Sequence, residues 1–413
     1  MGKKCSLVVV LGLFAFGVCA QDFSVFLMGD AGEPVFPEDA NIKYLQEKTV
    51  NASADDVLIF LGDNLYPKGL PGEEHPDRAA MERKLIPQLD VMKNFKGRTY
   101  IIPGNHDWAQ GRKQGLEYIR NMEKFVTAYT GKPEAFLPKN GCPGPEEIIL
   151  TDKVTLIIID TQYFLHSQEK GREADGCVAP GTGEALELLQ DMIIRNANKH
   201  VIVAAHHPLY TYGPHGGKYK FWKANLFPLT EAKSMKNLYI PLPGLGSIYW
   251  VSRAVIGNIQ DIPNPKYKII RNVLLDVIGK ADNVVWASGH EHSLQYIKKD
   301  GAHFVVSGSG SKTAHVVSGP GTEFYKGEKG FAEVKYQNSG AVDLTFWSGA
   351  QQTSLYQTSL YTKQVVTDQE ELENRPDYST QSIKTSASEQ YAIKQKAKFW
   401  LGENYRKTWL QTK

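Results

Sequence analysis

Short apolar segments alternate with helix-like segments along most of the chain, and this order restricts the fold more than any other feature. Seven segments are apolar on both faces, which is typical of strands buried in covered sheets: Phe23–Met28, Val57–Leu61, Thr99–Ile102, Val154–Ile159, His200–Ala204, Val284–Ala287 and His303–Val306. Helical patterns lie between them: Asn41–Val50, Arg78–Met92, Gly115–Thr130, Glu184–Asn198 and Tyr267–Lys280. Strands that alternate with helices predict an α/β fold.

The two ends and one internal region depart from this order. Lys3 and Lys4 precede an apolar run that ends at Ala20, which predicts a secretory signal peptide over residues 1–20. An uncleaved anchor is the alternative, although a membrane span usually needs about 18 or more apolar residues. Residues 212–265 are rich in Gly, Pro and aromatic side chains, so we expect an insertion there, either a binding loop or a packed surface excursion.

The predicted main domain covers residues 21–350, and a polar segment follows it. Residues 351–413 are rich in Ser, Thr, Gln and Lys and finish in a helical stretch. We expect a linker and a C-terminal helical tail, which offers a possible route of association with an envelope partner.

Charge argues against nucleic-acid binding, and the cysteine content argues against a zinc site made of thiolates. The formal net charge is +2 over 413 residues, which argues against a nucleic-acid-binding surface. Export would place the chain in the periplasm, at the cell surface or outside the cell. Without the signal peptide, the remaining cysteines are Cys142 and Cys177, and we expect one disulfide bond between them. Two thiols are too few for a zinc site.

Polar side chains follow five of the predicted strands, at the point where each strand ends: Asp30, Asp63 with Tyr66, Asn105 with His106, His206, and His290 with His292. In α/β sheets, ligands gather at the carboxyl ends of the strands. A single Asp or His at such a place is usually a turn former or a helix cap. Five in succession indicate a metal or catalytic cluster.

The types of side chain indicate which metals this cluster takes. Carboxylates, an amide, a phenol and imidazoles without a thiolate favour Fe, Mn or Zn. About seven ligands exceed what one tetrahedral ion needs, so two ions that share a carboxylate are the simpler solution. Two ions about 3.5–4 Å apart can hold the attacking and leaving oxygens of a displacement at phosphorus.

The ordered motifs resemble those of the purple acid phosphatases, the tyrosine-bearing branch of the calcineurin-like metallophosphoesterases. These motifs are Gly-Asp30-x-Gly, Gly-Asp63-x-x-Tyr66, Gly-Asn105-His106-Asp107, Val203-x-x-His206 and Gly-His290-x-His292. Their spacing is more similar to the small, tartrate-resistant type. The resemblance runs from about Phe23 to Gly310, and it implies two mixed β-sheets packed face to face and flanked by helices. Gly32 stands where most of the superfamily has a ligand His, and Tyr66 supplies the missing ligand.

The resemblance also implies a role for each matched residue. Asp30, Asp63, Tyr66 and His292 would bind Fe(III), and Asp63, Asn105, His206 and His290 would bind a divalent Fe, Zn or Mn ion. His106 and His215 would bind the phosphate of a phosphorylated substrate and assist the leaving group. The implied function is an exported acid phosphatase that hydrolyses phosphomonoesters by attack of a metal-bound hydroxide.

Two other functions remain open. The same site could serve a phosphodiesterase, or a phospholipid or phosphoprotein phosphatase, with the insertion at residues 212–265 contacting the larger substrate. The chain could also be an envelope-associated assembly protein that carries a phosphatase domain.

Several residues near the motifs receive a structural interpretation. We expect His207 to point away from the metals and Asp160 to act as a turn or capping residue. His303 and His315 are expected to be ordinary polar residues. Ser307-Gly308-Ser309-Gly310 is expected to form a permissive turn beside the site, since neither a nucleophile elbow nor a phosphate-loop motif is present.

Overall fold

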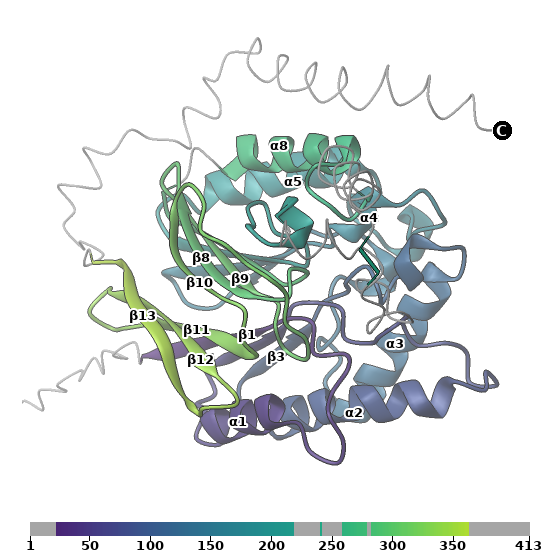
Figure 1. Ribbon diagram of the computed structural model, residues 1–413. Coiled ribbons are helices and arrows are strands. Elements are labelled where there is room, and N and C mark those ends of the chain that lie inside the picture. Colours follow the sequence, from purple (N-terminus) through teal and green to yellow (C-terminus); the bar gives the residue numbers. More distant parts are fainter. Residues whose placement is uncertain (1–21, 219–239, 242–257, 279–281, 363–413) are drawn as a thin grey trace, which may run out of the picture.

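Two β-sheets pack face to face between two layers of helices in the computed structural model (Figure 1). The structure describes residues 22–218, 240–241, 258–278 and 282–362. The predicted signal peptide, most of the predicted insertion and the predicted docking tail beyond residue 362 lie outside the described residues. Within the described ranges, every helix is too short or too polar to span a membrane.

The first sheet has six strands in the order β13-β12-β11-β1-β2-β3. Their bounds are β1 (Phe23–Met28), β2 (Val57–Phe60), β3 (Arg98–Ile101), β11 (Gly330–Tyr336), β12 (Val342–Ser348) and β13 (Thr353–Tyr361). β1, β2 and β3 are parallel, whereas β11, β12 and β13 add to the edge of β1 in antiparallel order. β13 lies beyond the expected domain end at residue 350, so the sheet includes part of the segment that was expected to be a linker.

The second sheet has seven strands in the order β10-β8-β9-β7-β6-β5-β4. Their bounds are β4 (Glu146–Ile149), β5 (Val154–Ile158), β6 (His200–Ala205), β7 (Val284–Ser288), β8 (Leu294–Lys299), β9 (Ala302–Ser307) and β10 (Thr322–Lys326). β5, β6, β7 and β9 run parallel, and the remaining three strands are antiparallel to their neighbours. Both sheets are therefore mixed, and the expected fold class is confirmed.

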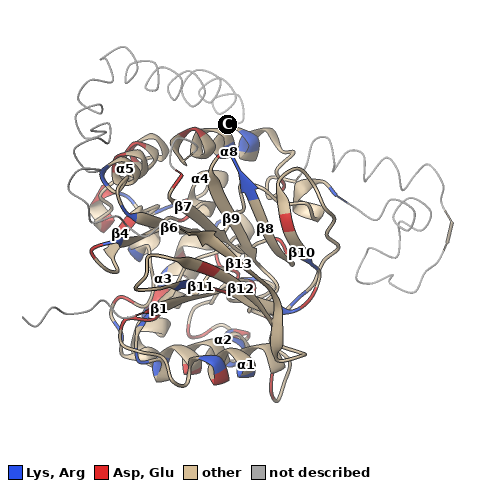
Figure 2. Cartoon of the chain, turned by 90° about the vertical axis from the view of Figure 1, so that its left-hand side faces the viewer, with Lys and Arg blue, Asp and Glu red and all other residues tan. Residues whose placement is uncertain are grey.

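Helices cover the outer face of each sheet (Figure 2). Their bounds are α1 (Ala40–Thr49), α2 (Arg78–Asn94), α3 (Gly115–Thr130), α4 (Gln162–Leu165), α5 (Thr182–Arg195) and α8 (Pro265–Ile278). Short 3₁₀ turns lie at Ala109–Gly111, Lys139–Gly141, Glu173–Asp175 and Pro214–Gly216. α1, α2 and α3 pack on the first sheet, and α5 and α8 pack on the second.

Strands that are apolar on both faces supply three cores at once. In β1, Val25 and Leu27 point into the core between the two sheets, while Phe26 and Met28 pack against the helices. In β6, Ile202 lies between the sheets and Val203 packs under α5 and α8. Because successive side chains of a strand point to opposite faces, a strand covered on both sides must be apolar throughout.

The parallel strands end level with one another. Met28 of β1 pairs with Phe60 of β2, and Phe60 pairs with Ile101 of β3. In the second sheet, Ala205 of β6 pairs with Ser288 of β7. The loops that follow these five strands therefore leave the two sheets at a shared edge.

A disulfide bond joins Cys142 to Cys177, which are 35 residues apart in the sequence. It links the segment before β4 to the segment before α5. The expected pairing of these two cysteines is confirmed.

Candidate metal centre

The candidate ligands lie in the loops that follow β1, β2, β3, β6 and β7. Three of them have a positive φ angle: Asp30 (59°), Asp63 (53°) and His290 (68°). Non-glycine residues in this region carry about 1–3 kcal/mol of strain each, and such residues cluster at functional sites. The three turns direct buried polar side chains toward one place at the edge of the sheets.

Four side chains form the first cluster: Asp30, Asp63, Tyr66 and His292. The Tyr66 hydroxyl lies 2.7 Å from Asp30 Oδ1, 3.0 Å from Asp63 Oδ2 and 3.2 Å from His292 Nε2. His292 Nε2 is 3.4 Å from Asp30 Oδ1. Donors bound to one metal at about 2.1 Å lie about 3.0–3.4 Å apart. The separations to Asp63 and His292 fit this spacing, whereas the 2.7 Å between Tyr66 and Asp30 is a short hydrogen bond.

The second cluster consists of Asp63, Asn105, His206 and His290. Asn105 Oδ1 lies 3.1 Å from His206 Nε2 and 3.0 Å from His290 Nδ1. The two imidazole nitrogens are 3.2 Å apart, and His206 Nε2 is 3.4 Å from Asp63 Oδ1. Asp63 belongs to both clusters, one oxygen facing each. The structure thus brings together all seven residues that were predicted as metal ligands.

Main-chain carbonyl groups fix the orientation of the two buried histidines. His206 Nδ1 lies 2.8 Å from the oxygen of Leu61, and His290 Nε2 lies 2.7 Å from the oxygen of Gln260. Each of these nitrogens must carry a hydrogen, so a neutral ring directs the lone pair of its other nitrogen into the cluster. With both rings neutral, two nitrogen lone pairs and the Asn105 oxygen would face one another, an arrangement that suits a bound cation.

The titration behaviour of the cluster also indicates a need for positive charge. Burial lowers the pKa of His206, but the attraction of Asp63 outweighs it and raises the value to about 9. Burial alone would raise the pKa of Asp63. The attraction of His206 and His106 lowers this pKa by more, so the Asp63 carboxyl stays ionised. Burial and the carboxylates of Asp30 and Asp63 raise the pKa of Tyr66 well above 10. A phenolate here therefore needs a strongly positive neighbour.

His207 belongs to another possible grouping, because it lies near His206 and His290. Its Nδ1 is 2.7 Å from the Thr161 hydroxyl and its Nε2 is 2.8 Å from Gln260 Oε1. Both ring nitrogens are thus occupied by hydrogen bonds, which leaves none for a metal. The structural interpretation of His207 agrees with this geometry.

His106 lies beside Tyr66 of the first cluster, and His215 lies beside His290 of the second. His106 Nδ1 lies 2.7 Å from the oxygen of Pro67, and its ring packs on Tyr66 with the centroids 4.4 Å apart. His215 Nδ1 lies 2.8 Å from Asp261 Oδ1, and its ring packs on His290 at 4.0 Å. The bond at Nδ1 fixes the orientation of each ring.

Four residues that support the site were given no role by the sequence analysis. The buried carboxylate of Asp107 accepts hydrogen bonds from the main chain of Asn64, Leu65 and Gly104, and so ties the loop of Asp63 to the loop of Asn105. The other three, Asp261, Glu291 and Lys312, are described next.

Asp261 and Glu291 both hold the segment that carries His215. Asp261 bonds to the His215 ring, and Glu291 Oε2 accepts a hydrogen bond of 2.9 Å from its main-chain N–H. Lys312 Nζ lies 2.9 Å from the centroid of the Tyr66 ring and 3.0 Å from Glu33 Oε2. The position of Glu291 between His290 and His292 was the one signal in the sequence that could have identified it.

Other residues take the structural roles that were expected. Asp160 Oδ1 accepts hydrogen bonds from the main-chain N–H groups of Gln162 and Tyr163 at the start of α4, so it is a capping residue. The turn at residues 307–310 packs directly against the loop of Asp30, where Gly310 N–H donates to the oxygen of Gly29. His303 is buried and lies 2.8 Å from the Tyr296 hydroxyl.

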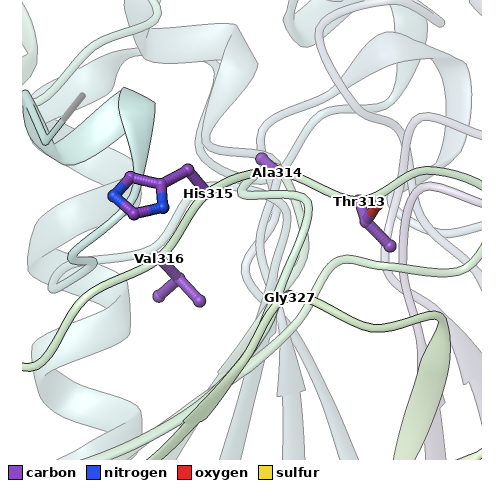
Figure 3. A pocket seen from close by; sticks show the side chains of 5 residues that line it. All are labelled: Thr313, Ala314, His315, Val316 and Gly327. Carbon is purple, nitrogen blue, oxygen red and sulfur yellow. The ribbon is translucent and has the colours of Figure 1, made fainter. Parts of the chain in front are cut away.

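A pocket of about 390 Å³ lies next to the His292 side of the site (Figure 3). It is lined by Thr313, Ala314, His315, Val316 and Gly327. Ala314 N–H donates a hydrogen bond of 2.6 Å to the oxygen of His292. The candidate ligands themselves do not line this pocket, so it is a neighbour of the site and not the site itself.

The family of the chain follows from a match to the model of the calcineurin-like phosphoesterases over residues 23–238. This match covers more than half of the 413 residues, and the chain belongs to this family. Its members hydrolyse phosphoesters at a dinuclear metal site, and the two clusters described above could bind the metals. No curated protein sequence matches the chain at a significant level.

Similar solved structures include GAP50, the anchor in the inner membrane complex of Plasmodium. It shares 16% identity over 87% of this chain and 96% of that chain, with a TM-score of 0.48. Purple acid phosphatase PPD1 from yellow lupin seeds shares 13% identity over 83% of this chain and 54% of that chain, with a TM-score of 0.44. PhoD shares 9% identity over 88% and 78%, with a TM-score of 0.45. Identities of 9% to 16% are too low to transfer an activity to this chain.

Proposed function

We propose that the chain is an exported acid phosphatase of the purple, small tartrate-resistant-like type that hydrolyses phosphomonoesters. The observation that carries this proposal is the position of the Tyr66 hydroxyl, 2.7 Å from Asp30 Oδ1 and 3.0 Å from Asp63 Oδ2. Most members of the superfamily have a histidine at the position of Gly32. A tyrosine that replaces this ligand is the feature by which the sequence resembles the purple acid phosphatases.

The two clusters fit two different ions. The first cluster contains a phenol and two carboxylates, which are hard ligands suited to Fe(III). The second contains two imidazoles and an amide oxygen with one carboxylate, which suit a divalent Fe, Zn or Mn ion. When bound, the two ions would polarise the phosphate and activate water as a nucleophile at low pH.

The two histidines beside the clusters would handle the substrate and the proton. His106 Nε2 lies 3.9 Å from Asp63 Oδ2, so its N–H can reach a phosphate oxygen placed over the bridging carboxylate. His215, with Nδ1 bonded to Asp261, would donate a proton from Nε2 to the oxygen of the departing alcohol. General acid catalysis of this kind contributes about 10²–10⁴-fold in rate.

Export is supported by the basic and apolar pattern of residues 1–20 together with the Cys142–Cys177 disulfide, a bond typical of oxidising compartments. Expression of the full chain in a secreting host tests this part. We expect mass spectrometry of the exported protein to find an N-terminus at Gln21. An N-terminus at Met1 in a membrane-bound product would contradict cleavage.

The activity itself is tested with the purified chain, an aryl phosphate and metal analysis. We expect two metal ions per chain, an absorption band in the visible range from iron–tyrosinate charge transfer, and turnover at acidic pH. Asp63→Ala removes the carboxylate that is expected to contact both metals, so this variant should lose turnover. Asp55→Ala, which removes an exposed carboxylate near the start of β2, serves as the control and should match the wild type.

Two results would change the proposal in different ways. A fully metallated but colourless enzyme would remove the iron–tyrosinate assignment and retain the two-metal site. Faster turnover of an aryl phosphodiester than of the monoester would replace the monoesterase by a phosphodiesterase. Absence of turnover on both esters would refute the enzymatic function.

A further inference from the structure

We propose that Glu291, the residue between the predicted ligands His290 and His292, is a positioning residue that holds the proton donor His215 at a fixed place relative to the metals. This inference rests on the proposed function, because it concerns how the leaving group receives its proton. It assigns a role to a side chain that does not face the metal clusters.

Glu291 is fully buried and is enclosed by the loop that carries His215. Its Oε2 accepts hydrogen bonds from the His215 main-chain N–H, at 2.9 Å, and from the Thr211 hydroxyl, at 3.1 Å. A β-carbon on Gly213 would lie within 2.5 Å of both carboxyl oxygens, so only glycine fits at that position. The loop therefore wraps around the carboxylate from Thr211 to His215.

Glu291 also links the main chain of this loop to the segment of the predicted metal ligands, in addition to the packing of the His215 ring on His290. The turn at residues 261–262 also contacts His215: Asp261 bonds to its ring, and Ile262 N–H donates to its carbonyl oxygen at 2.8 Å. Those contacts fix the rotation of the ring. The hydrogen bond that the His215 N–H donates to Glu291 fixes the distance of this main chain from His290 and His292, which lie on either side of Glu291 in the chain.

Burying a carboxylate costs free energy of folding unless hydrogen bonds compensate for the lost hydration. An apolar residue would avoid this cost, but it could not accept the two hydrogen bonds from the loop. Hydrogen bonds from donors to a charged acceptor are short and strong, so they define a position better than packing does. Since a misplacement of about 1 Å in a reacting group can reduce a rate about 10²-fold, this contact has a catalytic consequence.

The test is the dependence of the rate on the leaving group. Phenyl phosphate needs a proton on its departing oxygen, whereas 2,4-dinitrophenyl phosphate releases a stable anion and does not. Glu291→Met keeps the length of the side chain but removes both carboxyl oxygens, so the His215 N–H and the Thr211 hydroxyl lose their shared acceptor. We expect kcat for phenyl phosphate to fall about 10- to 100-fold more than kcat for the dinitrophenyl ester.

Three further variants sharpen the test. Gly213→Ala pushes a methyl group into the Glu291 carboxyl and should give the same signature even though Glu291 is retained. In a His215→Ala background, Glu291→Met should cost no more than about twofold, because the two residues act through one another. Glu333→Gln changes a hydrogen-bonded glutamate that accepts from Trp347 on the first sheet, and should leave the ratio of the two rates unchanged.

Several results would overturn the proposal. Equal losses on the two esters, or a full effect of Glu291→Met in the His215→Ala background, would show that Glu291 does not act through His215. A loss of bound metal in Glu291→Met would place the defect in His290 and His292 instead. Absence of turnover of both esters by the wild type would refute the proposed function and this inference with it, whereas an active wild type with equal losses refutes this inference alone.

Discussion

Gly104 packs closely against Asp63 and His206, two of the predicted ligands. Gly104→Ala should therefore damage the site without removing any predicted ligand. A β-carbon on Gly104 would overlap the main-chain nitrogen and Oδ1 of Asp63 and would stand 2.9 Å from His206 Cε1. The φ angle of Gly104 lies outside the left-handed region, so the added methyl group acts through the steric overlap alone.

The size of the effect follows from this overlap. Carbon atoms in contact prefer about 3.5–4.0 Å, so the loop must retreat from His206 by about 0.6 Å or more, and further from Asp63. The next residue is Asn105, whose Oδ1 lies 3.0 Å from His290 Nδ1 and must move with the loop. We expect a loss of about 1–3 kcal/mol in the free energy of unfolding and about 10- to 100-fold in kcat/KM.

The assay measures kcat/KM on an aryl phosphate, the metal content and the unfolding midpoint of the same preparations. Gly183→Ala is the matched control, because a β-carbon there meets no atom within 4 Å and the residue lies in α5. If Gly104→Ala retains two metals per chain and a kcat/KM within about twofold of the wild type, close packing of these loops is not required, and the reasoning is wrong.

Three further predictions concern stability and the state of the metal site. The Cys142→Ser/Cys177→Ser double variant should lose about 4 kcal/mol in the free energy of unfolding by guanidinium titration, because the disulfide closes a loop of 35 residues; an unchanged midpoint would contradict this. Lys312→Met removes a positive charge 2.9 Å from the Tyr66 ring centroid, so the visible band of the iron-loaded protein should move to longer wavelength; a band that stays in place would contradict the contact. Burial raises the pKa of Asp160 from 3.8 to about 7, so the folded chain retains a proton that the unfolded chain releases, and stability should fall by up to about 4 kcal/mol as the pH rises from 4 to 7. Asp160→Asn should abolish this part of the pH dependence in urea titrations at the two pH values, and an unchanged slope would contradict the assignment.

The parallel strands could be predicted because they are covered on both faces. Segments such as Val57–Leu61 and His200–Ala204 are apolar throughout, and the structure places β2 and β6 there. The antiparallel strands gave a weaker signal. β13 reads TSLYQTSLY, is largely exposed along its first half, and was assigned to a polar linker. Its place in the sheet depends on hydrogen bonds to β12. The residues of β13 alone do not indicate this pairing.

The ligands could be predicted for a similar reason. Each follows a buried strand, and parallel strands that end level with one another deliver their loops to the same edge. Asp261 and Glu291 could not be predicted in the same way. Their partner is His215, which lies 46 residues before Asp261 and 76 before Glu291, and the contact exists only once the loops have met.

The sequence by itself determined the α/β alternation, the order of the polar residues predicted as metal ligands, and the presence of Tyr66 among them. These features are written in local patterns: the period of apolar residues and the residue types that follow each strand. The tertiary structure alone decided which oxygen of Asp63 faces each cluster, which nitrogen of His206 and His290 is free for a metal, and how His215 is held. Those properties arise from hydrogen bonds between loops that are distant in the chain, and only the packing of the two sheets brings the loops together.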